Sequence, residues 1–135
     1  MEYNVPNDFY REEKMTEKIA LVTGSGKGIG RDIALRLAST VSGVAVHYFR
    51  DRKAAQETVS MVVDAGAAGK SFRADLTVED EALQLVHQVE EAFGRIDLLI
   101  NNVGPIQVKP WADTGSEDWD RILSGNLKTS HFCMK

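Results

Sequence analysis

Apolar residues along the chain change their spacing at regular intervals, and this change predicts strands that alternate with helices. Short apolar runs, which are typical of buried strands, occupy residues 18–23, 44–48, 71–75 and 96–100, and the third run is the weakest. Between these runs, apolar residues recur every three or four positions, as they do on one face of a helix. The pattern therefore predicts four strands, each followed by a helical segment.

The first two helical segments are each ended by glycine. Gly43 interrupts the first, and residues 65–69 end the second, which spans 51–64. The apolar face predicted for the first helix consists of Ile29, Ile33, Leu37 and Val41. The face predicted for the second consists of Ala55, Val59 and Val62.

The last two helical segments carry capping signals. Thr77 is predicted to cap the third helix, with Asp80 in its first turn, and Gly94 is predicted to end it. Ser116 is predicted to cap the fourth. The apolar face of the third helix consists of Ala82, Val86, Val89 and Phe93. The fourth helix carries Trp119, Ile122, Leu123 and Leu127.

This alternation predicts an α/β fold. The strands read as continuous apolar runs, which favours a parallel sheet that is covered by helices on both faces. Since crossover connections are right-handed, a doubly wound parallel sheet is the expected arrangement, with about four strands present.

Composition narrows the class of protein. The 135 residues correspond to one ordinary domain, and 43% of them are hydrophobic, enough for a core. A net charge of −4 gives no support for a nucleic-acid-binding surface, and the single cysteine, Cys133, excludes an internal disulfide framework. No apolar run reaches membrane-spanning length and no signal peptide precedes the first strand, so a cytoplasmic location is expected.

The glycine-rich stretch TGSGKGIG, residues 23–30, lies where the first strand passes into the first helix. A helix N-terminus offers free N–H groups and a partial positive charge, and both attract phosphate. The spacing is Gly24-x-x-x-Gly28-x-Gly30, since Ile29 stands where the common Gly-x-Gly-x-x-Gly pattern needs glycine. A glycine-rich turn that binds no ligand is the alternative interpretation.

Three motifs in this order resemble the short-chain dehydrogenase/reductase family. They are the Thr-Gly-x-x-x-Gly-Ile-Gly stretch, Asp75-Leu76 after the third strand, and the run Asn101-Asn-Val-Gly104 after the fourth. The resemblance runs from about Met15 to the end of the chain and is nearest to members similar to 3-oxoacyl-carrier-protein reductases and to sugar or polyol dehydrogenases. It implies a Rossmann-type fold with a nicotinamide dinucleotide across the carboxyl ends of the strands.

The resemblance also implies site residues. The diphosphate loop would comprise Gly24, Ser25, Gly26, Lys27, Gly28, Ile29 and Gly30. Asp75 would accept a hydrogen bond from the adenine amino group beside the Leu76 backbone. The cofactor would be lined by Asn101, Asn102, Val103 and Gly104, with Asn102 tying neighbouring strands together and Val103 replacing the usual alanine. Asn126 matches the helix asparagine that supports a proton-relay water, although an ordinary helix polar residue is the alternative.

The residues after the second strand favour NADP(H) over NAD(H). An NAD site prefers a carboxylate there to bind the ribose hydroxyls, whereas this chain has Tyr48, Phe49 and Arg50. Lys27 and Arg50 together could hold the 2′-phosphate through charge-assisted hydrogen bonds. The alternative is that both side chains are simply solvated.

In the family, a serine and a Tyr-x-x-x-Lys pair after the fifth strand catalyse hydride transfer between a small carbonyl or alcohol substrate and the cofactor. This sequence stops at Lys135, before that position, so an N-terminal fragment of an oxidoreductase, inactive by itself, is expected. The literal match in Tyr10–Lys14 precedes the first strand and is rejected, because catalysis depends on placement. The tetramer that the resemblance suggests is expected only for a full-length form.

Two other function classes stay open. One is a catalytically silent dinucleotide-binding module or a pseudogene product. The other, less favoured, is a methyltransferase, which would require an acid at the end of the second strand and would leave Asn101–Gly104 unexplained.

Residues 1–14 show no apolar periodicity and are expected to be a disordered leader or the result of a start codon assigned too early, with translation beginning at Met15. Residues 15–135 then form the N-terminal part of an NAD(P)-binding domain.

Other candidate chemistry is weak. The histidines His47, His87 and His131 are scattered without metal-ligand spacing, so no metal site is expected. Cys133 is interpreted as a small packed residue. Trp111 either borders a substrate entrance, as the resemblance implies, or covers the core.

Overall fold

Four parallel strands form the sheet that organises residues 17–135, the part of the chain that the computed structural model describes. The strands are β1 (Ile19–Val22), β2 (Gly43–Tyr48), β3 (Ala68–Arg73) and β4 (Leu98–Ile100), in the order β3-β2-β1-β4. Val22 lies opposite Val46 of β2 and Ile100 of β4. The predicted parallel α/β fold is confirmed. The leader predicted at residues 1–14 and the Tyr10–Lys14 match lie outside the described residues.

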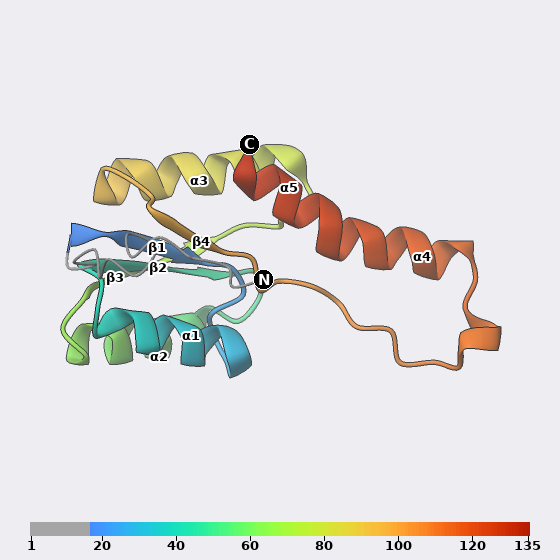
Figure 1. Cartoon of the computed structure of the whole chain (residues 1–135), viewed down its shortest axis with the longest axis horizontal. Coiled ribbons are helices and arrows are strands. Elements are labelled where there is room, and N and C mark those ends of the chain that lie inside the picture. The colour runs from blue at the N-terminus through green and yellow to red at the C-terminus, as the bar shows by residue number, and fades with distance from the viewer. Residues whose placement is uncertain (1–16) are drawn as a thin grey trace, which may run out of the picture.

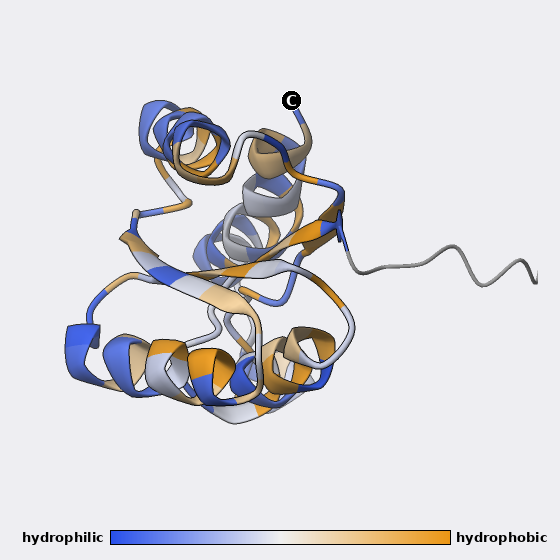
Figure 2. Ribbon diagram, turned by 90° about the vertical axis from the view of Figure 1, so that its left-hand side faces the viewer, coloured by the Kyte–Doolittle hydropathy of each residue, from blue (hydrophilic) through white to orange (hydrophobic). Residues whose placement is uncertain are grey.

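Helices cover both faces of the sheet (Figure 1). The helices of one face are α1 (Gly28–Ala38) and α2 (Arg52–Asp64), and those of the other face are α3 (Glu79–Phe93) and α5 (Thr129–Met134). Figure 2 shows the same two helical layers on opposite sides of the strands from a second direction. The sheet is therefore doubly wound, as the sequence predicts.

Each face of the sheet has its own core, since successive side chains of a strand point to opposite faces. Ala20 and Val22 of β1 pack in the cluster under α1 and α2. Leu21, between them, packs in the cluster under α3 and α5. All four residues of β1 are buried, which explains why a parallel central strand reads as an uninterrupted apolar run.

After β4, the chain leaves the sheet and forms an arm, defined here as residues 104–123 (Figure 1). The arm contains a short 3₁₀ helix, η3 (Trp111–Asp113), and the helix α4 (Ser116–Leu123). A π-helical segment, η4 (Ser124–Lys128), joins α4 to α5, which packs back on α3. The helix predicted after Ser116 thus exists, but it contains a π-helical turn.

Two predicted helix caps are wrong by one residue. Val78, not Thr77, precedes α3, because the Thr77 hydroxyl donates to the Asp75 carboxylate at 2.6 Å. Gly115, not Ser116, precedes α4, and its N–H donates to Asp118 at 3.0 Å. The predicted end of α3 at Gly94 is confirmed, since Gly94 adopts a left-handed conformation with φ of 82°.

Helix α1 requires a correction at Ile29 alone, because Ile33 and Leu37 of the predicted face pack, partly buried, against the core and Val41 after the helix is buried. Its buried residues are the small ones, Gly30, Ala34 and Ala38, whereas Ile29 is 73% exposed. Small side chains let α1 approach the sheet closely, so residue size, rather than hydrophobicity alone, selects the buried face.

Strand boundaries also differ. β3 spans 68–73 instead of 71–75, and β4 spans 98–100 instead of 96–100. β3 is an edge strand in which exposed and covered residues alternate, so it lacks a continuous apolar run. The described helices include none that is long and apolar enough to cross a membrane.

Candidate functional site

The carboxyl ends of β1 and β4 are joined by the side chains of Thr23 and Asn102. The buried Thr23 hydroxyl accepts the N–H groups of Asn102 at 2.9 Å and Val103 at 3.1 Å, and it donates to the Ile100 carbonyl at 3.3 Å. The Asn102 amide donates to the carbonyls of Thr23 at 3.0 Å and Gly24 at 3.2 Å. Asn102 therefore ties the two strand ends together. Between them lies the crevice where α/β sheets bind ligands.

The glycine turn requires glycine for two different reasons. Gly24 has φ of 63°, in the left-handed region that side chains disfavour, and a Cβ there would lie 2.9 Å from Val103 Cγ2. At Gly30, a Cβ would overlap the Gly24 carbonyl oxygen and would lie 2.6 Å from Asn102 Nδ2. Glycine thus allows α1 to begin directly against the crevice.

The first turn of α1 supplies an anion-binding geometry. Gly28, Ile29 and Gly30 occupy this turn, where backbone N–H groups have no partner within the helix. Lys27 precedes the turn with an exposed side chain. Backbone donors and a cation thus meet at the positive end of a helix, an arrangement that can hold a phosphate.

Ser25 takes a different position in the loop. Its hydroxyl donates to the Val22 carbonyl at 2.7 Å, and its N–H donates to the His47 carbonyl at 3.0 Å. The residue is fully buried, so its side chain holds the turn instead of facing the crevice.

Arg31 fixes the outer side of the glycine turn, and the sequence analysis did not single it out. Its guanidinium donates to the carbonyls of Gly26 at 2.6 Å and Ala54 at 3.0 Å, and to the Thr58 hydroxyl at 2.8 Å. Thr58 also donates to Gly26 at 3.0 Å. Arg31 therefore clamps the turn to the start of α2.

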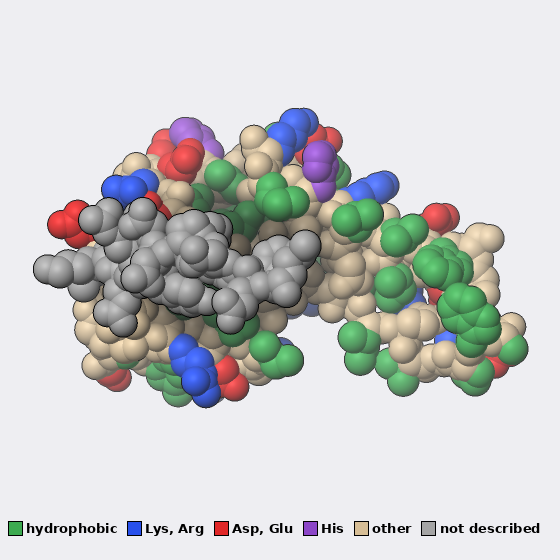
Figure 3. All heavy atoms as spheres, in the orientation of Figure 1, with side chains coloured by type: hydrophobic (Ala, Val, Ile, Leu, Met, Phe, Trp, Pro, Cys, Tyr) green, Lys and Arg blue, Asp and Glu red, His purple; other side chains and the backbone are tan. Residues whose placement is uncertain are grey.

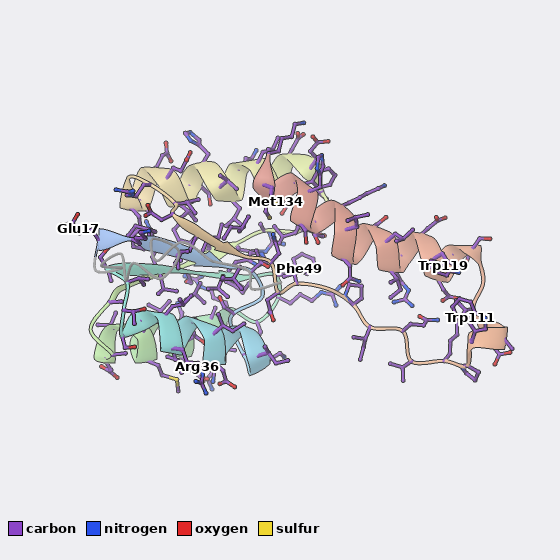
Figure 4. The ribbon with its side chains drawn as sticks, in the orientation of Figure 1. Glu17, Arg36, Phe49, Trp111, Trp119 and Met134 are labelled. Atoms are coloured by element: carbon purple, nitrogen blue, oxygen red, sulfur yellow. The ribbon has the colours of Figure 1, made fainter. Side chains whose placement is uncertain are left out.

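Two cavities lie side by side at the carboxyl ends of the strands, of about 320 and 360 Å³. Both are lined by Gly24, His47, Phe49 and Arg50. The first extends to Lys27, Asp51 and Ala54, and the second to Asp75, Leu76 and Val103. Figure 4 shows Phe49 at this end of the sheet, opposite Glu17. The cavities bring residues from all three predicted motifs around one elongated space.

The first cavity carries the charges that the sequence associates with a 2′-phosphate. Lys27 and Arg50 both line it, and the end of β2 places Tyr48 and Phe49 there in place of an acid. Asp51 is the acidic neighbour: its carboxylate lies 3.8 Å from Lys27 Nζ and accepts the Ala54 N–H at 3.0 Å, which caps α2. The positive charge of Lys27 is thus partly neutralised by the carboxylate of Asp51.

Asp75 lines the second cavity as an ionised acceptor. The hydrogen bond from the Thr77 hydroxyl holds the pKa of Asp75 below its usual value, and the positive charges of Arg50 and Arg73 add to the effect. Its backbone N–H donates to Glu81 at 2.7 Å, which fixes the start of this segment on α3. Leu76 is buried beside it. A carboxylate held in this way can accept a hydrogen bond from a ligand amino group.

His47 has a role at this site that spacing along the sequence did not indicate. The side chain is 2% exposed, and its Nδ1 accepts the Gly24 N–H at 2.9 Å while its Nε2 lies 3.1 Å from the Ala74 carbonyl. Burial lowers the pKa of His47. The one signal of its burial in the sequence is that His47 directly follows the apolar residues of β2.

Asn126 lies in the π-helical segment η4. Its amide donates to the carbonyls of Pro105 at 3.0 Å and Ile122 at 2.9 Å. A Cβ on Gly104 would overlap Asn126 Oδ1, so glycine permits this contact. Asn101 and Gly104 are exposed where the chain leaves β4. π-helical turns occur frequently at functional sites, and this one brings Asn126 against the segment that follows β4.

The remaining candidates lie outside the crevice. His87 and His131 are exposed on α3 and α5, and Cys133 is buried with the pKa of its thiol raised by burial. Trp111 is exposed on the arm, in edge-to-face contact with Trp119 at 5.9 Å (Figure 4). It covers no core. Within residues 17–135, no three His, Cys, Asp or Glu side chains gather in a way that could hold a metal ion.

Fold and glycine turn together define an α/β protein of the Rossmann type. The family model for short chain dehydrogenases matches residues 18–135, and the chain belongs to this family.

Relatives and solved structures agree with that assignment. The chain is 36% identical to the hydroxynaphthalene reductase-like protein Arp2 of Metarhizium robertsii over 87% of its own length and 44% of that protein. It is 40% identical to a short-chain dehydrogenase/reductase of Armillaria gallica, covering 46% of that protein. A dehydrogenase structure from Burkholderia cenocepacia with bound NADP matches at TM-score 0.85 and 31% identity, over 94% of this chain and 49% of that one. The chain therefore spans a little under half the length of the proteins it matches.

Proposed function

We propose that this chain is the cofactor-binding part of an NADP(H)-dependent oxidoreductase. The observation that carries the proposal is the pairing of Lys27 and Arg50 around one cavity at the end of β2, where an NAD site prefers a carboxylate. The bound NADP of the Burkholderia cenocepacia structure supports the same choice for this chain.

The described residues fit such a dinucleotide along the whole crevice. The N–H groups of Gly28, Ile29 and Gly30 bind the pyrophosphate, and Lys27 and Arg50 bind the 2′-phosphate. Asp75 accepts the adenine amino group beside Leu76. The segment Asn101–Gly104 lines the path toward the nicotinamide. When bound, NADP(H) supplies the hydride that reduces a carbonyl or the acceptor that oxidises an alcohol.

Asn126 has a supporting role in proton transfer. Its side chain is held by two carbonyl groups, from Pro105 and Ile122, which fixes the π-helical turn beside Gly104. A water positioned from this turn would serve the proton relay that the family resemblance implies. Residues 17–135, which the structure describes, contain no Tyr-x-x-x-Lys pair, so the isolated chain is expected to bind the dinucleotide without turnover.

The substrate class belongs to the same proposal. A small carbonyl or alcohol compound is the expected substrate, and the 3-oxoacyl-carrier-protein-reductase-like interpretation stands beside the names of the hydroxynaphthalene reductases, which indicate an aromatic substrate. The cytoplasmic location is proposed on the sequence alone. The tetramer is proposed for a longer form of the protein.

Cofactor preference is tested by titrating the purified chain with NADPH and with NADH in a calorimeter. We expect tighter binding of NADPH and, for Arg50→Ala, a loss of about tenfold in NADPH affinity with little change for NADH, since one charge-assisted contact to the 2′-phosphate disappears. Arg52→Ala is the matched control, because Arg52 is exposed on α2 and does not line either cavity. Tighter binding of NADH by the parent chain would refute the preference.

The predicted lack of turnover has its own assay. NADPH oxidation is followed at saturating carbonyl substrate, after binding has been measured on the same preparation. Binding without turnover is the expected result, and it also fits a silent dinucleotide-binding module. Sustained carbonyl reduction by the pure chain would overturn the prediction of inactivity.

A further inference from the structure

The imidazole of His47 connects the carboxyl ends of β1, β2 and β3 on one side of the crevice. His47 belongs to β2, its Nδ1 contacts the N–H of Gly24 after β1, and its Nε2 contacts the carbonyl of Ala74 after β3. The backbone carbonyl of His47 also accepts the Ser25 N–H at 3.0 Å. Both Gly24 and Ala74 adjoin residues assigned above to the dinucleotide.

The two contacts require one protonation state. A backbone N–H can only donate, so Nδ1 must be unprotonated to accept from Gly24. A carbonyl can only accept, so Nε2 must carry the proton that is donated to Ala74. The ring is therefore a neutral Nε2–H tautomer. A second proton, on Nδ1, would set two donors against each other at the glycine turn.

We propose that His47 is a positioning residue that holds the glycine turn and the Ala74–Asp75 segment at the separation that the dinucleotide needs. This role rests on the proposed function, since it concerns the same site. Neutral His47 supports binding, and a protonated ring disrupts the turn. Dinucleotide affinity then depends on the charge of a residue that does not itself contact a phosphate.

Charged side chains near the His47 ring come from the glycine loop and from the segments that follow β2 and β3. Lys27 comes from the glycine loop, Arg50 and Asp51 follow β2, and Asp75 follows β3; all four line the cavities that His47 also lines. Arg73 and Glu81 lie beyond Asp75 and are 4.0 Å apart. Burial is the largest cause of the lowered pKa of His47, and the hydrogen bond to the Ala74 carbonyl opposes it.

Three substitutions separate the two contacts. His47→Asn places an amide oxygen near the position of Nδ1 and keeps an acceptor for Gly24. His47→Gln reaches toward Ala74 and leaves the Gly24 N–H without that acceptor. His47→Leu removes both contacts. We expect NADPH affinity to fall tenfold or more in the Leu variant and to follow the order Asn above Gln above Leu, because the glycine turn contacts the pyrophosphate.

His87→Leu is the matched control, since the His87 side chain is 71% exposed on α3. Circular dichroism checks that each variant is folded. If the Leu variant does not fold, the comparison of Asn with Gln decides the question, and equal affinity of those two variants would overturn the proposal.

Imidazole ¹⁵N chemical shifts of the parent chain report the protonation state of His47, and the pH dependence of NADPH affinity is the readout that a merely structural residue would not change. We expect the shifts of an Nε2–H tautomer at pH 7. We also expect the ratio of parent to Asn-variant NADPH affinity to fall only as the pH drops below the ordinary histidine value of about 6.5, because burial lowers the pKa of His47 and asparagine does not titrate. An Nδ1–H tautomer, or a ratio that stays constant while the ¹⁵N shifts show the ring becoming protonated, would overturn the proposal.

The two hypotheses fail in different ways. A parent chain that binds neither NADPH nor NADH refutes the proposed function. A parent chain that binds, together with a folded Leu variant that binds equally well, refutes only the positioning role of His47.

Discussion

The Thr23 hydroxyl forms three hydrogen bonds that join the strand ends at the crevice, and no spacing pattern in the sequence indicates this role. It accepts two backbone N–H groups, from Asn102 and Val103, and donates to Ile100 while being 1% exposed. Thr23→Val keeps the shape but leaves both N–H groups without this acceptor, at about 1–3 kcal/mol for an unsatisfied buried donor. We expect the free energy of unfolding, measured in urea, to fall by an amount in this range.

Thr23→Ser tests the same site from the other side. It keeps the hydroxyl and loses only a methyl group, worth about 0.8 kcal/mol. Thr40→Val provides a surface control, because the exposed Thr40 hydroxyl donates only to the Leu37 carbonyl. Equal stability of the Thr23→Val and Thr23→Ser proteins would show that the hydroxyl network contributes nothing.

Asp51 should oppose the cofactor preference that Lys27 and Arg50 create. Its carboxylate lies 3.8 Å from Lys27 Nζ and lines the same cavity, so it repels a 2′-phosphate placed there. Asp51→Asn removes the charge and keeps an oxygen that can cap α2 through the Ala54 N–H. We expect NADPH to bind about threefold to tenfold more tightly and NADH almost unchanged, since removing one nearby like charge is worth about 1 kcal/mol near a surface.

Calorimetric titration with both dinucleotides measures that change. Asp64→Asn, at the opposite end of α2, is the control that alters net charge by the same amount. Weaker NADPH binding by Asp51→Asn would mean that the carboxylate helps to organise the site.

Single residues of the candidate site could be predicted from the sequence where a recognisable motif directly follows a predicted strand. Gly24 and Gly30 could be recognised because a strand passes into a helix there, and Asn102 because its motif follows the fourth strand. Thr23, Arg31 and His47 could not be assigned a function, because their partners come from other elements: Asn102 is 79 residues from Thr23, and Thr58 is 27 from Arg31. Only the folded sheet brings these groups together.

Among the elements, α4 is held to the preceding loop by the carboxylate of Asp118. That carboxylate pairs with Lys109, accepts the Gly115 N–H at 3.0 Å and lies 3.6 Å from Arg121. The hydrogen bonds from Lys109 and Gly115 lower the pKa of Asp118 from 3.8 to about 2. Because the folded pKa lies below the unfolded one, this contribution to stability is complete above pH 4 and is lost as the pH falls from about 4 through 2.

Asp118→Asn should reproduce the acid form at neutral pH. It removes the ion pair with Lys109 while keeping an acceptor for Gly115, so the loop 105–115 should exchange its amide hydrogens faster than in the parent chain. Hydrogen exchange followed by mass spectrometry measures this. Asp113→Asn, on the exposed η3, is the control. Unchanged exchange in the Asp118 variant would show that Lys109 does not hold the loop.

The elements that the sequence predicted well are those whose burial is uniform. β1 is buried along its whole length and was recognised at once, whereas β3, at the sheet edge, was placed three residues late. The predicted face of α1 was wrong at Ile29, which is exposed while Gly30, Ala34 and Ala38 pack closely, because hydrophobic spacing cannot register a preference for small side chains. The π-helical turn at Asn126 has no periodic signal of its own.

The whole molecule combines a sheet with two buried cores and an arm whose apolar side chains are largely exposed. Figure 3 shows these side chains gathered over the arm. The exposed fractions are 79% for Ile106, 83% for Val108 and 77% for Trp111. Leu123 and Leu127 extend this surface along α4 and η4. Exposed apolar side chains gathered in this way mark an interaction site or an aggregation liability.

We therefore expect the 135-residue chain to self-associate at micromolar concentration, and sedimentation velocity measures this. Replacing Leu123 and Leu127 by glutamine should shift the chain toward the monomer. Their exposed fractions, 46% and 67%, are similar to those of Met61 and Val63 on α2, 43% and 53%, so the same double replacement there is the control. A monomeric parent chain, or equal dissociation by both double variants, would show that Leu123 and Leu127 do not drive association.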